Sequence, residues 1–425
     1  MTVRRHFTEN LKSENIQKTI EKKPRKVIFA WNYLEWGGAQ VYFLGIANRI
    51  KDRAEVKMIL PQETGAQLVK FCENLQIPIQ FLDVKNDLKP APTLFRKIER
   101  HWNKFQAEYK LLKCLNKQDL RESIVHIELA PWQSLISLMR LCRKTIVFIT
   151  MHNSLPTVSK WRFLLWKIKF AIITRFKNFH IFASNQNAKD SLKPLVSAEF
   201  LEKVKVTYTN VNPDEIDEAL SVEIDREGLL KKFFLPIDKF LVFCVGQFID
   251  RKGRWTFLEA ARTIQEQNQD ICFVWVSNSV LTEKELEQIK SYNLANIFYL
   301  LNSDDIGEQH IELFKFLRIA DAFSLPSFVE GLPISLLEAM ALGIPSISTN
   351  VNAIPEAVKD LETGILIEAG NSEALAAAIL QLRIDKTLRE KISIDGRKYV
   401  LENFNEKVVA EIAFSEYQKS LDNQK

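Results

Sequence analysis

Short apolar runs alternate with longer amphipathic segments along most of the chain. The first series follows a polar lead-in and has seven members, at residues 27–30, 56–60, 77–82, 124–127, 145–150, 180–183 and 204–208. Runs this short have the length of buried strands, and most of the segments between them are long enough for a helix. The alternation therefore predicts an α/β fold with a largely parallel sheet.

The pattern then restarts with a second series of six runs, at residues 240–245, 271–276, 297–300, 322–325, 345–349 and 364–367. Each series opens with a strand followed by glycine, Gly37-Gly38 in the first and Gly246 in the second. A strand, a glycine turn and a helix form the opening unit of a doubly wound domain, in which ligands bind beyond the carboxyl ends of the strands. We therefore expect two Rossmann-like domains that face each other across a cleft holding the site.

The two series set the predicted domain boundaries. We expect a basic N-terminal extension over residues 1–26, a first domain over 27–209, a linker over 210–236, a second domain over 237–395 and C-terminal helices over 396–425 that cross back to the first domain. The extension lacks the apolar core of a secretory signal, and no apolar run reaches the roughly 18 residues that span a bilayer. Five scattered cysteines are typical of thiols in a reducing compartment, so we expect a cytoplasmic protein.

Charge divides the chain into two unlike halves. Residues 1–200 hold 34 Lys and Arg against 17 Asp and Glu, whereas residues 201–425 hold 24 against 36. No acid lies between Glu128 and Asp190, and residues 159–179 interleave aromatic with basic side chains. That composition predicts contact with an anionic membrane surface, the inner face of the plasma membrane, although an ordinary helix with a solvated basic face has the same pattern. We do not expect nucleic acid as a partner, because the chain contains no recognised nucleic-acid module.

Two carboxylates frame an apolar run in the segment SFVEGLPISLLEAMALGIPS, residues 327–346. Ser335 and Glu338 have capping-box spacing, which predicts a helix that begins near Ser335, with Glu330 in the preceding loop and Glu338 in the first turn. A helix N-terminus favours phosphate, and carboxylates beside it can accept hydrogen bonds from hydroxyl groups. A nucleotide sugar has this layout. Alternatively, Glu338 only caps its own helix and Glu330 is a solvated acid.

The segment EGLPISLLEAMALGIPSIST, with PEAV and TGILIEAGNSEALAAAI after it, resembles the nucleotide-sugar signature of retaining GT-B glycosyltransferases of group 1, which are family 4-like. WGGAQVYFLGIA at residues 36–47 and VGQFIDRKG at 245–253 resemble the glycine and phosphate loops of that family. The resemblance implies a metal-independent transferase without a cofactor, which moves a sugar from a nucleotide-diphosphate donor to a saccharide or lipid-linked saccharide. It also implies a role in cell-surface polysaccharide or glycolipid biosynthesis.

The resemblance further implies a role for each matching residue. Glu330 would contact the transferred sugar, Lys252 would neutralise the diphosphate, and His152 would line the acceptor side. Glu338 would bind the ribose hydroxyls, and Gly38 would let the backbone approach the phosphates. The other donor-binding candidates are Gly37, Gly246, Gln247, Arg251, Gly331, Leu332 and Ser335.

Several positions depart from the pattern of that family. Gln247 stands where arginine is usual, so Arg251 is the candidate for a second positive charge, and Ser277-Asn278-Ser279 replaces Gly-Asp-Gly. These departures motivate a different hypothesis, a non-catalytic subunit that binds sugar nucleotide or glycan. The sugar, the base and the acceptor depend on variable loops, for which residues 86–105 and 277–285 are the candidates.

Overall fold

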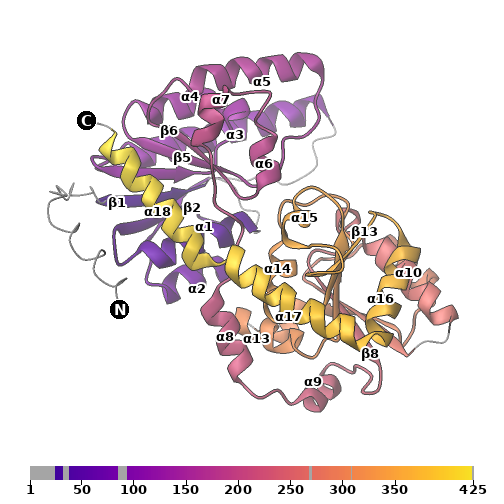
Figure 1. The fold of residues 1–425 in the computed structure, drawn as a ribbon. Coiled ribbons are helices and arrows are strands. Elements are labelled where there is room, and N and C mark those ends of the chain that lie inside the picture. The colour runs from indigo at the N-terminus through magenta and orange to yellow at the C-terminus, as the bar shows by residue number, and fades with distance from the viewer. Residues whose placement is uncertain (1–23, 32–37, 85–92, 268–269, 308, 424–425) are drawn as a thin grey trace, which may run out of the picture.

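The computed structural model describes residues 24–31, 38–84, 93–267, 270–307 and 309–423 and contains two parallel sheets (Figure 1). Most of the predicted N-terminal extension and Gly37 lie outside the described residues. The first sheet has the order β3-β2-β1-β4-β5-β6-β7 and the second β10-β9-β8-β11-β12-β13. Each predicted apolar run overlaps one of these strands, so the prediction of an α/β fold with two doubly wound domains is confirmed.

The first sheet pairs β1 with both β2 and β4, so that Val27 lies beside Val56 and Ile124. Its strands are β1 (Lys26–Ala30), β2 (Glu55–Pro61), β3 (Ile79–Leu82), β4 (Ser123–Ile127), β5 (Ile146–Met151), β6 (Phe179–Ala183) and β7 (Lys205–Val206). The helices around it are α1 (Gly38–Ile50), α2 (Ala66–Asn74), α3 (Leu94–Leu115), α4 (Pro131–Cys142), α5 (Lys160–Ile173), α6 (Gln186–Asp190) and α7 (Ala198–Lys203). Because α3, α4 and α5 share one buried cluster and α1 and α2 another, the helices cover both faces.

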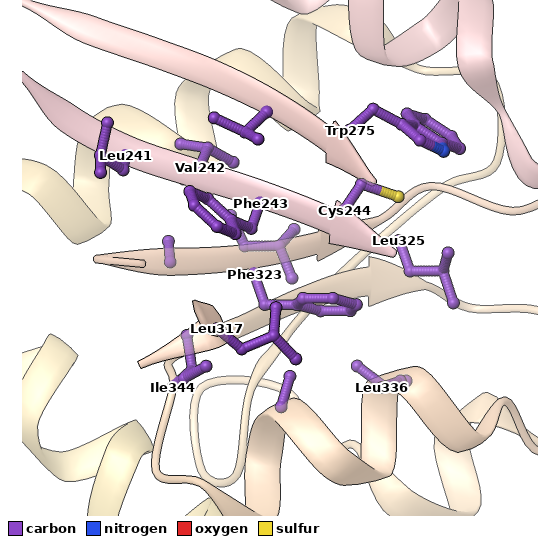
Figure 2. Close-up of a cluster of buried hydrophobic side chains, with 14 of the residues drawn as sticks. Leu241, Val242, Phe243, Cys244, Trp275, Leu317, Phe323, Leu325, Leu336 and Ile344 are labelled. Atoms are coloured by element: carbon purple, nitrogen blue, oxygen red, sulfur yellow. The ribbon is translucent and has the colours of Figure 1, made fainter. Parts of the chain in front are cut away.

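The second sheet is built around β8, which pairs with β9 and β11. Figure 2 shows the core here, where Phe243 of β8 and Phe323 of β11 are both fully buried. The strands are β8 (Phe240–Val245), β9 (Ile271–Ser277), β10 (Phe298–Asn302), β11 (Ala322–Leu325), β12 (Ser346–Thr349) and β13 (Ile365–Ile367). The helices are η1 (Asp250–Lys252), α10 (Arg254–Glu266), α11 (Glu283–Ser291), α12 (Ser303–Ile306), α13 (His310–Leu317), α14 (Ile334–Ala341), α15 (Ile354–Ala357), α16 (Ser372–Ile384) and α17 (Lys386–Asn403).

Two segments expected to be irregular are helical. Residues 210–236 contain α8 (Pro213–Ser221) and α9 (Arg226–Lys232), which join the second core through Ile216 and Leu230. In the expected loop 86–105, α3 begins at Leu94, where the Thr93 hydroxyl caps its N-terminus. Both differences arise because tertiary burial and a local cap stabilise helices that the strand pattern did not indicate.

The chain crosses between the domains twice at one place. Val211 donates its N–H to the carbonyl of Phe404 at 2.9 Å, and Glu406 donates to the carbonyl of Val211 at 3.0 Å. Helix α18 (Glu406–Asp422) then packs on α1, and Figure 1 shows it in yellow along the first domain. The return to the first domain therefore occurs near residue 404, later than residue 396, because α17 stays packed on α14.

Candidate active site

The loop after β8 turns sharply against the end of β11. Gly253 has φ +78°, and a Cβ at this position would overlap the carbonyl oxygen of Pro326. Only glycine fits this combination of backbone angle and close approach. Gly246, with φ +148°, faces the Lys252 side chain, and Gln247 is exposed. The predicted phosphate loop is therefore a compact turn that presents Lys252 from its 3₁₀ helix, η1.

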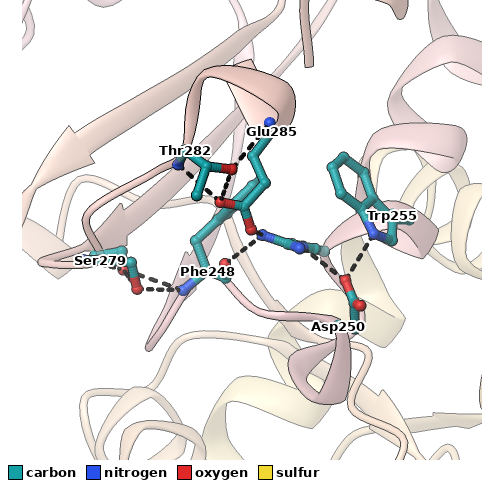
Figure 3. A network of polar contacts seen from close by, with 8 residues as sticks. Phe248, Asp250, Trp255, Ser279, Thr282 and Glu285 are labelled. Carbon is teal, nitrogen blue, oxygen red and sulfur yellow. Dashed lines mark hydrogen bonds and ion pairs between the residues drawn. The ribbon is translucent and has the colours of Figure 1, made fainter. Parts of the chain in front are cut away.

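Buried Arg254 holds this loop in shape through a network of polar contacts that includes Phe248, Asp250 and Glu285, which Figure 3 labels. Its guanidinium donates to the carboxylates of Asp250 at 2.8 Å and Glu285 at 2.6 Å, and to the carbonyl of Phe248 at 2.9 Å. The N–H of Phe248 donates in turn to the hydroxyl of Ser279 at 2.9 Å. Sequence reasoning missed Arg254. Ser279, which departs from the Gly-Asp-Gly pattern, supports the loop by accepting this hydrogen bond.

Lys252, Arg251 and Glu330 form one ion cluster. The Lys252 ammonium lies 2.6 Å from one Glu330 carboxylate oxygen, and the Arg251 guanidinium lies 3.3 Å from the other. Glu330 is buried and also accepts a hydrogen bond from the Ser327 hydroxyl at 2.8 Å. Two cations face one carboxylate, so these three side chains retain one surplus positive charge, which suits an anionic ligand.

The predicted capping box at Ser335 is wrong. Helix α14 begins at Ile334 with Pro333 in the cap position, so Glu338 lies in the second turn. The Ser335 hydroxyl donates instead to the carbonyl of Val245, at the end of β8, at 3.0 Å. The sequence spacing could not show that a neighbouring strand supplies this acceptor.

Glu338 is buried and paired with a histidine from α13. Its carboxylate lies 3.1 Å from Nε2 of His310, and Nδ1 of His310 lies 3.0 Å from Glu215 of α8. Burial lowers the pKa of His310, but the two carboxylates outweigh burial and raise it to about 10. Glu338 is therefore held in place by an imidazolium. Sequence reasoning missed both His310 and Glu215, which come from elements far apart in the chain.

The first domain meets the second at Gly331. A Cβ on Gly331 would lie 2.5 Å from the carbonyl oxygen of His152, just beyond the end of β5. Nε2 of His152 lies 2.9 Å from the Glu128 carboxylate, and its ring packs edge-on against Tyr42 of α1, the helix that Gly38 opens. The carboxyl ends of β5 and β11 thus converge, and His152 lies next to the loop that carries Glu330. Glu128 was not a sequence-based candidate.

The structure thus brings some of the predicted residues together and separates others. Lys252, Arg251 and Glu330 touch directly, and Gly331 is wedged against the first domain. Leu332 is buried, and the contacts of Glu338 are made to His310. The site has two polar centres on the second domain and one, His152 with Glu128, on the first.

The second domain contains most of a segment that matches a known family. Residues 225–399 match the family model described as glycosyl transferases group 1. The capsular polysaccharide biosynthesis glycosyltransferase CapM of Staphylococcus aureus is 26% identical over 54% of this chain and 59% of its own length. The UDP-Gal:alpha-D-GlcNAc-diphosphoundecaprenol alpha-1,3-galactosyltransferase of Escherichia coli is 28% identical over 60% of this chain and 62% of its own length. The chain thus matches less than two thirds of either relative.

Solved structures extend the likeness to both domains. A glycosyltransferase from Rickettsia africae superposes with a TM-score of 0.72 at 19% identity, covering 95% of this chain and 100% of that one. Anabaena HepE, crystallised with UDP, superposes with a TM-score of 0.70 at 18% identity, covering 93% of this chain and 100% of that one. At these identities the likeness shows the fold, which is the GT-B architecture.

Proposed function

Residues 225–399 match the family model of glycosyl transferases group 1, and from this match we propose that the chain is a retaining, metal-independent glycosyltransferase. It moves a sugar from a nucleotide-diphosphate donor to a hydroxyl of a saccharide or lipid-linked saccharide. The names of CapM and of the galactosyltransferase support a role in cell-surface polysaccharide or glycolipid biosynthesis.

The cluster of Lys252, Arg251 and Glu330 carries this proposal. As the bond between the sugar and the diphosphate breaks, negative charge grows on the leaving phosphate oxygens. Lys252 and Arg251 neutralise that charge, and fixed cations need no reorganisation during the reaction. Glu330 holds both cations at the end of β11 and accepts hydrogen bonds from hydroxyls of the transferred sugar.

The donor lies along the start of α14. The free N–H groups of the first turn of α14 face the diphosphate, while Glu338, oriented by His310, accepts hydrogen bonds from the ribose hydroxyls. HepE was crystallised with UDP and with UDP-glucose, which makes a uridine nucleotide our choice of donor.

The acceptor enters from the first domain. The hydrogen bond between Nε2 of His152 and the Glu128 carboxylate fixes the orientation of the His152 ring beside the loop that carries Glu330. In this position the imidazole of His152, with the carboxylate of Glu128 beside it, can polarise the attacking hydroxyl and take up its proton. Residues 159–179, which include α5, bring the cytoplasmic protein to the inner face of the plasma membrane, where a lipid-linked acceptor resides.

Donor binding and turnover test this proposal together. We expect UDP to raise the melting temperature of the protein more than GDP or ADP does, because a ligand that binds the native state stabilises it. We expect UDP-sugars to be hydrolysed slowly and transferred with retention of the anomeric configuration, which proton NMR of the product reports. Glu338→Gln should weaken the UDP shift. A protein that binds UDP-sugars but turns over none with any acceptor would instead be the non-catalytic binding subunit.

A further inference from the structure

Helix α3 carries an apolar stripe that no described part of the chain covers. The exposed fractions of Leu94, Ile98, Trp102, Phe105 and Tyr109 are 74%, 61%, 60%, 60% and 52%. Their spacing of three or four residues places them along one face of the helix, about 24 Å long at 1.5 Å per residue. Four of them line a shallow hollow on the surface.

This stripe is separate from the core face of the same helix. The core face comprises the buried residues Ala107, Leu111, Leu112, Cys114 and Leu115, all towards the C-terminal end. A surface helix normally has one apolar face, directed at its own core. Helix α3 has two, and an uncovered apolar patch rimmed by polar residues marks a contact site.

The neighbouring helices continue the apolar surface. Helices α3, α4 and α5 cover the same face of the first sheet, and Trp132 of α4 packs against Trp166 of α5. Figure 1 shows α5 along the edge of the first domain, away from the second domain. We call the combined surface the α3–α5 face. Besides the stripe, its exposed apolar residues are Phe95, Ile136, Trp161, Phe163, Leu164, Leu165 and Ile168.

The charges on the α3–α5 face are overwhelmingly basic. Its exposed cations are Lys97, Arg100, Lys160, Arg162 and Lys167. The two acids of α3 are both engaged: Glu99 pairs with Arg96 at 2.7 Å, and Glu108 accepts hydrogen bonds from Ser134 and Ser137 of α4 at 2.6 and 2.8 Å. Helices α4 and α5 contain no acid. The complementary partner is therefore both apolar and anionic.

We propose that the α3–α5 face docks on an anionic lipid bilayer, with the α3 stripe as the main element that enters the acyl boundary. The basic residues then lie at the level of the lipid phosphates, as in interfacial helices. A second copy of the chain does not fit, because two such faces would bring like charges together. No helix among the described residues has the length and hydrophobicity needed to cross a bilayer. This inference rests on the proposed membrane contact of residues 159–179 and adds α3 to it.

Vesicle sedimentation of the full chain tests this inference. With vesicles of equal parts phosphatidylcholine and phosphatidylglycerol, we expect binding that weakens with salt, and little binding to phosphatidylcholine alone. The double variant Ile98→Glu/Trp102→Glu should lower the partition coefficient by about tenfold or more, because it places charge on the inserting stripe. Ile394→Glu is the matched control, since Ile394 is an isoleucine exposed to 67% on α17 of the other domain, and it should leave binding unchanged.

The remaining outcomes separate this inference from the proposed transferase. The inference fails if the double variant binds vesicles as the unaltered protein does. It also fails if sedimentation velocity shows a dimer that the double variant dissociates. The UDP-induced thermal shift, measured without lipid, should be the same in both proteins. Vesicle binding by a protein whose melting temperature does not respond to UDP, GDP or ADP would refute the proposed transferase but would leave the lipid-binding inference intact.

Discussion

The two domains share an architecture but differ in how their polar centres are built. In the second domain, Lys252, Arg251 and Glu330 form one ion cluster, and the family model covers all three. In the first domain, His152 depends on Glu128 from another strand, and the matched segment does not include either residue. A diphosphate presents the same charges in every donor, so the same set of cations can serve throughout a family. Acceptors differ from enzyme to enzyme, so a first domain need not carry a motif that a whole family shares.

Removing the charge of Lys252 should have the largest effect on turnover and so tests the polar centre of the second domain most directly. We expect Lys252→Met to lower kcat by about 100- to 1,000-fold, because the leaving diphosphate loses its partly buried ammonium partner. Steady-state kinetics with a UDP-sugar measure the effect. Lys284→Met on α11 removes an exposed lysine from the same domain and should leave kcat unchanged. Equal rates for both variants would remove Lys252 from the mechanism.

Adding one methyl group at the contact between the domains should have the next largest effect. Gly331→Ala places a Cβ against the His152 carbonyl, so the two strand ends must separate. We expect kcat/KM to fall by about tenfold or more, because reacting groups displaced by an ångström lose much of their rate. Gly65→Ala is the control, since nothing lies within 4 Å of a Cβ there.

Two histidines of the first domain, His126 and His152, should respond in opposite ways to substitution. His126 is fully buried, with its ring nitrogens 2.7 Å from the Tyr417 hydroxyl and 2.8 Å from that of Thr150. We expect His126→Ala to destabilise the protein by about 2 to 4 kcal/mol through a cavity and two lost hydrogen bonds. His152→Ala should instead lower turnover with little change in urea denaturation. If both variants lose only stability, His152 has no catalytic role.

Burial also makes the His126 contribution depend on pH. Burial lowers the pKa of His126 well below its ordinary value of 6.5, so the unfolded state binds a proton that the native state resists. Stability linked to His126 is therefore present above about pH 6.5 and is lost as the pH falls below it. Urea denaturation of His126→Phe should show less acid destabilisation than the unaltered protein.

The smallest expected effect is the alkaline loss of the His310 contacts. The pKa of His310 is raised to about 10, above its ordinary value of 6.5, so the imidazolium contributes full stability below about pH 6.5. That contribution declines as the pH rises towards 10. The stability difference between the unaltered protein and His310→Gln should therefore shrink between pH 7 and pH 10. A difference that stays constant would show that the His310 charge does not stabilise the fold.

The strands were predictable because burial on both faces of a parallel sheet requires continuous apolar runs, which the sequence displays directly. The helices at residues 213–232 and the start of α3 were not predictable from that pattern. Their stability comes from packing against segments distant in the chain and from the Thr93 cap. Ser335 shows the same limit within the site, since its spacing to Glu338 suited a cap but its hydroxyl bonds to Val245.

The order of residues along the chain by itself determined the strands of the two α/β domains, the glycine loop after β8 and the spacing of Glu330 and Glu338, because each is encoded in a short contiguous segment. Only the tertiary structure decided which partners those carboxylates have, Lys252 and Arg251 for one and His310 for the other. It also decided that none of the described residues covers one face of α3, next to α4 and α5. Ion pairs and exposed surfaces depend on distances between remote segments, and these exist only once the chain has folded.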